Sequence, residues 1–397
     1  MGTGAGQPAG APAHAAGVGP VALHVVQANL LPVPEGRAHA DILEQWHSLV
    51  DIAEIAAGSG VRVTVVQAAA RDQSMMRNGI EYRFVDVAGL SSPARRSRRI
   101  ADELTTIGAD CLHVHGLAFA ADVLALCRRL PGLPILCQDH ADRPPRWSRW
   151  LSWRRCYAEI PAVSFTAAGL ARPFRNAGVF GRQLEVFAIP ESSSRFRPGD
   201  RGQARALTGL HGDPCVLWIG HLDPGKDPLA VIDGVAAAAS RLPGLQLWMV
   251  FGTSALLEQV QDRIRAYPHL AGRVHLPGKV PHARVETLLQ AADVFVSGSH
   301  SESCGYALLE AMACDTMPVV TDIAAFRALA GDGTVGRLWP CGRPARLAEA
   351  LVDAWTRRAP PGRVRAHFDA ELSFAAVGRL WARAYQRLAA GGARSTR

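Results

Sequence analysis

The stretch "ADVFVSGSHSESCGYALLEAMACDTMPVVTD", residues 292–322, contains a complete strand, helix and strand unit. The apolar run "VFVSG" (294–298) predicts a buried strand, and "MPVVTD" (317–322) predicts a second one. Between them, "SHSESCG" predicts a loop, and a helical pattern begins at Tyr306. Short buried strands joined by a helix are typical of a parallel sheet covered by helices. This stretch therefore predicts an α/β fold.

The same alternation extends in both directions along the chain of 397 residues. Strands are predicted in the first half at 21–29, 61–69, 82–87, 111–116, 133–139, 162–167 and 184–189, and in the second half at 215–220, 245–252, 273–278, 294–298 and 317–322. Helices are predicted at 41–57, 95–107, 117–130 and 147–158, then at 228–241, 254–266, 282–291, 306–313 and 344–356. Two sets of alternating elements predict two Rossmann-like parallel-sheet domains, with ligands bound in the cleft between them.

Composition narrows the classes of protein. With 48% hydrophobic and 20% charged residues, the chain has the make-up of a globular protein with sizeable cores. The net charge of +8 suits anionic partners, but no long basic block indicates a nucleic-acid-binding protein. The eight cysteines show no metal-binding spacing, so free thiols in a reducing cytoplasm are expected. No membrane span and no secretory leader are predicted, and residues 1–20 are expected to form a disordered tail.

Charged residues follow two of the predicted strands. Glu302 lies in the loop after 294–298, Gly305 allows close backbone approach there, and Glu310 falls inside an apolar helical run. The first turn of that helix offers free N–H groups to an anion. Lys226 follows the strand 215–220, in a chain where Lys226 and Lys279 are the lysines among 43 basic residues, so a compact ammonium there suits a phosphate. Two simpler interpretations stay open: Glu310 as a structural group and Lys226 as a solvated loop lysine.

Taken together, these motifs resemble retaining glycosyltransferases of the GT-B fold, in particular glycosyltransferase family 4. The resemblance rests on "VLWIGHLDPGKDPL" (216–229), on the two glutamates within 292–322, and more weakly on "ADCLHVHG" (109–116). It covers the second domain well and the first mainly in its strand rhythm. It implies two Rossmann-like domains facing across a cleft, with a C-terminal helix that returns to the first domain.

The resemblance also implies a division of the chain. We expect a first, acceptor-side domain over 21–195, a second, nucleotide-sugar-side domain over 196–365, a crossover helix over 366–390 and a tail over 391–397. The boundary falls near "ESSSRFRPGDRG" (191–202), whose serines, proline and glycines fit a hinge. In "AELSFAAVGRLWARAYQRL" (370–388) an apolar stripe at helical spacing suits the crossover role.

By position, the resemblance assigns roles to the site residues. Lys226 would contact the diphosphate of a nucleotide-sugar, Glu302 would orient the sugar, and His115 would reach the donor sugar across the cleft; these are the expected catalytic residues. Glu310 would hold the ribose hydroxyls. The expected donor-binding residues are Gly220, His221, Lys226, Ser303, Cys304, Gly305, Tyr306 and Glu310. Because no Asp-x-Asp pair lies near this site, the sequence predicts no metal.

Three departures from the family pattern concern the site. His221 replaces the usual arginine and removes a permanent charge, while Cys304 stands where phenylalanine is common. In "LLPVPEGRAHAD" (30–41), only Gly36 remains of the usual glycine pair. Donor binding is still expected, whereas the acceptor stays open.

The expected reaction is transfer of a hexosyl group from a nucleoside-diphosphate-sugar to a hydroxyl acceptor (a glycan, a lipid-linked compound or a small molecule), with retention and without metal or other cofactor. An alternative is an accessory subunit that binds nucleotide-sugars with weak or no turnover.

One segment suggests a further partner. "RPPRWSRWLSWRRCY" (143–157) combines tryptophans and arginines, a composition that favours the headgroup region of anionic bilayers. If helical, it would place Trp147, Trp150, Leu151 and Arg154 on one side, but not Trp153. The segment is a candidate for peripheral contact with the inner membrane face; a packed helix with solvated arginines is the alternative.

Overall fold

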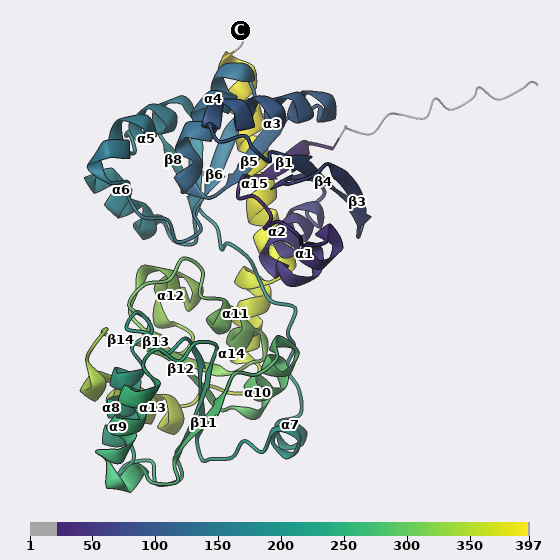
Figure 1. The fold of residues 1–397 in the computed structure, drawn as a ribbon. Helices are drawn as coiled ribbons and strands as arrows, with labels where there is room; N and C mark the ends of the chain where they lie inside the picture. Colours follow the sequence, from purple (N-terminus) through teal and green to yellow (C-terminus); the bar gives the residue numbers. More distant parts are fainter. Residues whose placement is uncertain (1–21, 396–397) are drawn as a thin grey trace, which may run out of the picture.

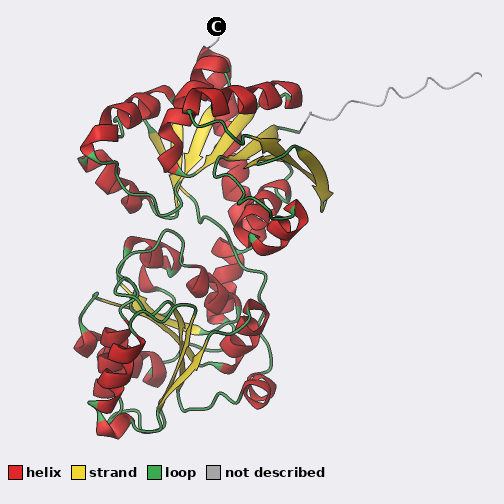
Figure 2. Cartoon of the chain, in the orientation of Figure 1, coloured by secondary structure: helices red, strands yellow, loops and turns green. Residues whose placement is uncertain are grey.

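The computed structural model describes residues 22–395 and contains two sheets, each covered by helices on both faces (Figures 1 and 2). The first sheet has eight strands in the order β3-β4-β2-β1-β5-β6-β7-β8, and the second has six in the order β11-β10-β9-β12-β13-β14. All neighbouring strands are parallel except the pair β3 and β4. The predicted fold class, two Rossmann-like domains, is confirmed. The expected tail over 1–20 and residues 396–397 lie outside the described residues.

The first lobe is formed by the chain up to about residue 190. Its strands are β1 His24–Asn29, β2 Arg62–Ala69, β3 Gln73–Arg77, β4 Ile80–Asp86, β5 Cys111–His115, β6 Ile135–Gln138, β7 Ala162–Phe165 and β8 Glu185–Ala188. Its helices are α1 His39–Gln45, α2 His47–Ala57, α3 Pro93–Ile107, α4 Ala120–Arg129, α5 Trp147–Glu159 and α6 Arg172–Asn176. The central strands are buried on both faces, which explains their continuous apolar runs.

The second lobe repeats the design with its own core. Its strands are β9 Cys215–Gly220, β10 Gln246–Phe251, β11 Val274–Gly278, β12 Val294–Ser297, β13 Met317–Thr321 and β14 Arg337–Trp339. Its helices are α7 Arg201–Thr208, α8 Pro228–Ala238, α9 Leu257–Arg265, α10 Val285–Ala291, α11 Tyr306–Ala313, α12 Ala324–Leu329 and α13 Pro344–Thr356. The predicted unit over 292–322 is present as β12, α11 and β13, with β12 between β9 and β13.

The last helices cross back to the first lobe. After α14 (Arg363–His367) and a π-helical turn (Phe368–Leu372), α15 (Phe374–Ser395) runs from the second lobe into the first, as the yellow ribbon shows (Figure 1). Trp381 and Tyr385 are fully buried in the core around α2 and β5. Gly378 allows the close approach, because a Cβ there would lie 2.6 Å from the carbonyl oxygen of Ile55. The predicted crossover helix is therefore confirmed.

Some predicted elements differ from those observed. The helix expected over 41–57 is two helices, because Trp46 adopts a non-helical backbone (φ −93°, ψ 71°) that divides α1 from α2. The edge strands β3 and β14 and the short helices α6, α7, α12 and α14 were not predicted, since their sequences are short and weakly patterned. The C-terminal helix continues to Ser395, so the tail expected from residue 391 begins too early.

The crossover helix generates a stability prediction. Because Trp381 is fully buried against first-lobe residues, Trp381→Ala should lower the free energy of unfolding by about 3–5 kcal/mol. Arg383→Ala, at an exposed position on the same helix, should change it by about 0.5 kcal/mol or less. Urea denaturation followed by circular dichroism measures both. Equal, small effects would show that α15 contributes little to the first lobe.

Candidate active site

Two loops meet at the carboxyl ends of adjacent strands in the second lobe. Lys226, in the loop after β9, forms an ion pair with Glu302, in the loop after β12. Both side chains are partly buried, with 27% and 16% exposure. The sequence placed both residues in the site, but their pairing was not predicted. In this structure the Glu302 carboxylate is bonded to the Lys226 ammonium group, which was expected to bind a diphosphate.

Close packing of these loops depends on the glycine at the end of β12. A Cβ on Gly298 would lie 2.9 Å from the carbonyl oxygen of Asp227. His300 fastens the contact, because its backbone N–H donates to Gly225 (2.8 Å) and its ring lies 2.8 Å from the Asp227 carboxylate. The approach of these backbones holds Lys226 within reach of Glu302.

The other residues expected after β9 lie beside this pair. Gly220 ends the strand, and a Cβ there would lie 3.7 Å from the Lys226 side chain and 3.1 Å from the ring of Trp218. His221 is exposed and lies over the end of β10, where a Cβ on Gly252 would come within 2.9 Å of its ring. His221 is therefore accessible at the rim of the site.

The turn into α11 has a special backbone. Gly305 has φ +80°, and a Cβ on it would lie 2.6 Å from the ring of Phe326. The preceding residue, Cys304, is fully buried between apolar residues of the second lobe and the segment of Glu191 and Ser192, and burial raises the pKa of its thiol. The role of Cys304 in donor binding stays a prediction.

Glu310 has a partner that was not predicted. Its Oε1 lies 2.7 Å from Nε2 of His282, and its side chain is 15% exposed. The hydrogen bond to this carboxylate raises the pKa of His282, against a smaller opposing effect of burial. Glu310 is thus reachable from the cleft and paired with an exposed, displaceable histidine.

A second buried carboxylate, Glu191, joins the two lobes. It lies where the chain leaves the first lobe and accepts hydrogen bonds from Tyr306 Oη (2.9 Å) and Ser303 Oγ (3.3 Å) of the second lobe. Its Oε1 is also 2.7 Å from Nδ1 of His140, in the loop after β6. Glu191 was missed because 191–202 has the composition of a hinge, and the available signal was a lone carboxylate ahead of three serines. His140 was also missed; it lies two residues after β6, outside any motif that the sequence singled out.

The two histidines of "HVH" in β5 have different environments. His113 Nδ1 lies 2.8 Å from Oη of Tyr385 in α15, and burial lowers the pKa of His113 to about 3. His115 is 7% exposed, its Nδ1 lies 3.0 Å from Nε2 of His140, and burial lowers its pKa well below the ordinary value. His113 thus anchors the crossover helix, and His115 faces the interlobe network.

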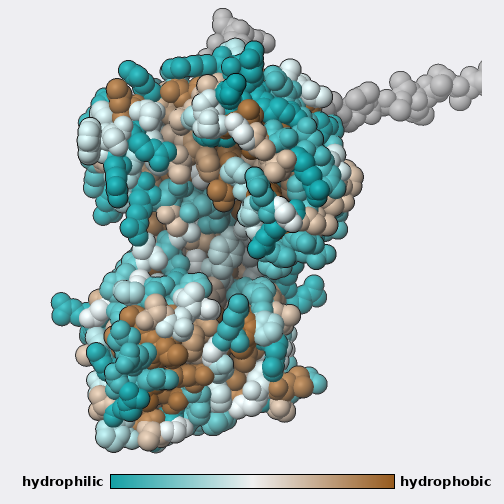
Figure 3. Space-filling model, in the orientation of Figure 1, coloured by the Kyte–Doolittle hydropathy of each residue, from teal (hydrophilic) through white to brown (hydrophobic). Residues whose placement is uncertain are grey.

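The largest feature at this network is a cavity of about 980 Å³ between the lobes, at the waist visible in Figure 3. Of the predicted site residues, it is lined by His115, Tyr306 and Glu310. Apolar side chains contribute much of the wall: Leu31, Trp46, Leu49, Ile52, Phe119, Phe196 and Ala307. Lys226 and Glu302 do not line this cavity.

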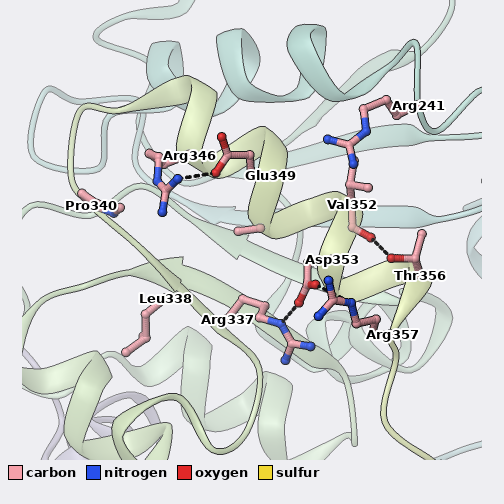
Figure 4. A pocket seen from close by; sticks show the side chains of 11 residues that line it. Arg241, Arg337, Leu338, Pro340, Arg346, Glu349, Val352, Asp353, Thr356 and Arg357 are labelled. Carbon is pink, nitrogen blue, oxygen red and sulfur yellow. Dashed lines mark hydrogen bonds and ion pairs between the residues drawn. The ribbon is translucent and has the colours of Figure 1, made fainter.

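Another cavity, of about 410 Å³, lies on the second lobe and is lined by four arginines (Figure 4). Arg337 and Arg357 both pair with Asp353, and Arg346 pairs with Glu349 at 2.5 Å. Because three of these four arginines are paired with carboxylates and no predicted site residue lines it, this cavity is not the candidate active site. Within residues 22–395, no cluster of three metal-ligating side chains is found, and no helix is both long and apolar enough to cross a membrane.

Comparison with known families agrees with this geometry. Residues 201–365 match the family described as Glycosyl transferases group 1. The chain is 32% identical over 241 residues to D-inositol 3-phosphate glycosyltransferase of Rhodococcus erythropolis, covering 58% of this chain and 54% of that protein. It is 28% identical over 309 residues to the protein of that name from Frankia alni, covering 72% of this chain and 74% of the relative. The chain thus spans about half the length of several relatives that it matches.

Solved structures share the whole architecture. Sucrose-phosphate synthase from Thermosynechococcus elongatus superposes with a TM-score of 0.66 at 17% identity, covering 93% of this chain and 100% of that one. The Anabaena protein Alr3699/HepE, solved in complex with UDP and glucose, gives a TM-score of 0.67 at 14% identity, covering 92% of this chain and 100% of the other. At these identities the likeness concerns the fold.

Two facing Rossmann-like domains joined by a returning helix, with paired loops at the carboxyl ends of the second sheet, make up the GT-B fold, which these solved structures share. Residues 201–365 are similar to the glycosyl transferases group 1, in agreement with the family 4 resemblance of the motifs in this region.

The Gly305 turn generates the prediction for this site. Gly305→Ala and Gly272→Ala both place alanine at positive φ, but only position 305 has a neighbour, Phe326, within 4 Å of the new Cβ at clashing distance. Both variants should carry the left-handed strain of about 1–2 kcal/mol, and Gly305→Ala should lose about 1–3 kcal/mol more from overpacking. Thermal unfolding of the two variants tests the difference, and equal melting temperatures would contradict the tight turn.

Proposed function

We propose that this protein is a retaining glycosyltransferase that transfers a hexosyl group from a nucleoside-diphosphate-sugar to a hydroxyl acceptor, without a metal cofactor. The observation that carries the proposal is the convergence of Lys226, Glu302 and the Gly305 turn at the carboxyl ends of β9 and β12, with Glu310 one turn further along α11. The Lys226 cation and the N-terminus of α11 would bind a diphosphate, and the Glu310 carboxylate would accept hydrogen bonds from the hydroxyl groups of an attached ribose.

The donor would rearrange two existing pairs. The diphosphate would take Lys226 from Glu302, leaving that carboxylate to orient the sugar, and the ribose hydroxyls would take Glu310 from His282. Cleavage of the anomeric bond builds positive charge on the sugar and negative charge on the leaving diphosphate. Lys226 and the N-terminus of α11 would stabilise the leaving group, with His221 at the rim as a further donor.

The acceptor would enter through the interlobe cavity of about 980 Å³, beside His115. In the reaction that the family resemblance implies, the acceptor hydroxyl attacks from the face that the diphosphate leaves, and the departing phosphate takes its proton. No covalent intermediate with the protein forms, and configuration is retained.

The alternative, a nucleotide-sugar-binding accessory subunit, predicts binding without turnover. Thermal shift with UDP-, GDP- and ADP-sugars identifies the donor, because a ligand at 100 times its dissociation constant stabilises the fold by about 2.7 kcal/mol. Release of the free nucleoside diphosphate from the stabilising donor then separates enzyme from accessory subunit.

Alanine variants of the two glutamates should fail differently. Glu310→Ala should weaken binding of both the donor and the free nucleoside diphosphate by about 1.5–3 kcal/mol, because hydrogen bonds to a charged acceptor are lost. Glu302→Ala should leave free diphosphate binding intact or tighter, because it frees Lys226, while lowering kcat. Calorimetry with the diphosphate and steady-state rates measure these effects. Equal binding by Glu310→Ala and the parent, with a much lower melting temperature, would make Glu310 structural.

We also propose that α5 contacts anionic lipid at the cytoplasmic face of a membrane. Trp147 is 91% exposed and Leu151 50% exposed on this helix, at the upper left of Figure 1. Trp153 is buried and stacks on Phe174, whereas Trp150 donates to the carbonyl oxygen of Ala177. The exposed arginines of this region add positive charge: Arg143, Arg146, Arg149, Arg154, Arg155, Arg172 and Arg175.

Sedimentation with phosphatidylserine vesicles at low salt tests this contact. Trp147→Ala should reduce the bound fraction, because an aromatic anchor for the headgroup region is lost. Leu207→Ala, which removes a 67% exposed apolar side chain from the second lobe, serves as the matched control and should bind like the parent. Absence of parental binding to these vesicles would exclude a membrane role for α5.

A further inference from the structure

Three side chains form a hydrogen-bonded chain from the interlobe cavity to the junction of the lobes. His115 lines the cavity, its Nδ1 lies 3.0 Å from Nε2 of His140, and Nδ1 of His140 lies 2.7 Å from Oε1 of Glu191. The remaining ring nitrogen of His115, Nε2, is buried and has no protein partner among the described residues. Both nitrogens of His140 are therefore committed, whereas Nε2 of His115 is buried near the side chain of Gln138, whose Oε1 also has no hydrogen-bond partner among residues 22–395.

The protons on this chain cannot be placed independently. Glu191 also accepts hydrogen bonds from Tyr306 and Ser303, so as a carboxylate it acts as an acceptor and requires the proton of His140 on Nδ1. If His140 is doubly protonated, its Nε2–H donates to Nδ1 of His115, and a neutral His115 then carries its own proton on Nε2. If His140 is neutral, its bare Nε2 accepts from Nδ1–H of His115, and Nε2 of His115 becomes an acceptor.

We propose that His140 and Glu191 are positioning residues that set the tautomer of His115, so that Nε2 of His115 changes from hydrogen-bond donor to acceptor when His140 loses a proton. His115 remains neutral in both states. One proton lost at His140 thus reverses the polarity of the group offered to a hydroxyl or carbonyl oxygen in the cavity.

The surroundings of the pair support this order of protonation. Burial lowers the pKa of His140, but the hydrogen bond and charge of Glu191, with Asp139 and Asp142, outweigh it, so the pKa of His140 is raised overall. Burial, with His113 and His140 nearby, lowers the pKa of His115 well below its ordinary value, against a smaller opposing effect of the Gln138 side chain. His140 is therefore the member of the pair that holds the extra proton.

The groups that face His140 come from several elements. Asp139 and Asp142 belong to its own loop, His113 and His115 to β5, Glu191 to the segment leaving the first lobe, and Tyr306 to α11 by way of Glu191. Among these, burial raises the pKa of Asp139 to about 7, so Asp139 can titrate in the same range. Asp139 accepts from the backbone of Asp142 at 3.0 Å, and no hydrogen bond between it and His115 is present in residues 22–395.

The consequence for catalysis rests on the proposed function, but the tautomer change itself does not. In a glycosyltransferase, the donor form of His115 would bind a lone pair of a sugar hydroxyl or of a carbonyl, whereas the acceptor form would bind a hydroxyl proton. Failure of the proposed function would appear as absence of nucleoside diphosphate release, with the tautomer change unaffected.

Nuclear magnetic resonance of the full chain with ¹⁵N-labelled histidine tests the proposal directly, with His115→Gln used to assign the ring signals. In the parent, the proton of His115 should move from Nε2 to Nδ1 over the same pH interval in which His140 changes from imidazolium to imidazole. His115 should show no imidazolium signal there. A single His115 tautomer throughout the titration of His140, or protonation of His115 itself, would overturn the proposal.

Two variants separate the causes. Glu191→Gln keeps the shape but removes the charge that favours the imidazolium, so the tautomer change should move to lower pH by about one to three units. Asp139→Asn removes the other group that titrates in this range and should preserve the change. Loss of the change in Asp139→Asn, or an unmoved midpoint in Glu191→Gln, would refute the assignment to His140 and Glu191.

Discussion

Burying a carboxylate costs free energy unless its oxygens accept hydrogen bonds. Glu191 is such a buried carboxylate, and it lies where the chain passes from one lobe to the other. Its partners come from both sides: His140 from the first lobe, Ser303 and Tyr306 from the loop and helix that begin the candidate donor site. Neither lobe alone supplies the full set. The position of the second lobe beneath the first is thus fixed by the need to satisfy one charge as well as by the apolar contacts of α15.

The two chain crossings reinforce the same arrangement. Ser193 donates to the carbonyl oxygen of Leu372 at 2.5 Å, so the outgoing and returning segments are bonded to each other beside Glu191. The guanidinium of Arg195 pairs with Asp51 and Glu54 on α2 and lies 4.3 Å from the ring of Phe374 at the start of α15. The junction of the lobes thus holds a carboxylate, a guanidinium and two backbone segments, each with defined partners. Ser193 and Arg195 of this junction also line the cavity beside His115.

The sequence predicted the elements that are determined by interactions between residues close together in the chain. The α11 and α13 boundaries, the alternation of strands and helices and the apolar stripe around Trp381 follow from periodicity and turn chemistry within short windows. The site residues were predicted as a set because Lys226, Glu302 and Glu310 lie in recognisable motifs. The partners Glu191, His140 and His282 were not predicted, because they lie in segments of ordinary composition. Glu191 is 51 positions from His140 and 115 positions from Tyr306, and His282 is 28 positions from Glu310. Cys304 shows the same limit: the motif places it in the loop, whereas its burial depends on the second-lobe core and on Thr166 and Glu191, which are distant in sequence.

The three carboxylates of the candidate site, Glu191, Glu302 and Glu310, are each paired with a basic side chain. Glu302 is balanced by Lys226, Glu310 by His282 and Glu191 by His140, so each negative charge in the site has a basic partner of its own. A ligand gains little by offering negative charge alone, because it must replace Glu302 at Lys226 and release that carboxylate nearby. A ligand that also presents hydroxyl groups can compensate, since the released Glu302 and Glu310 are then satisfied as acceptors. Inorganic phosphate lacks the sugar hydroxyls and a nucleoside lacks the charge, so under the proposed function the paired site would favour molecules that carry both.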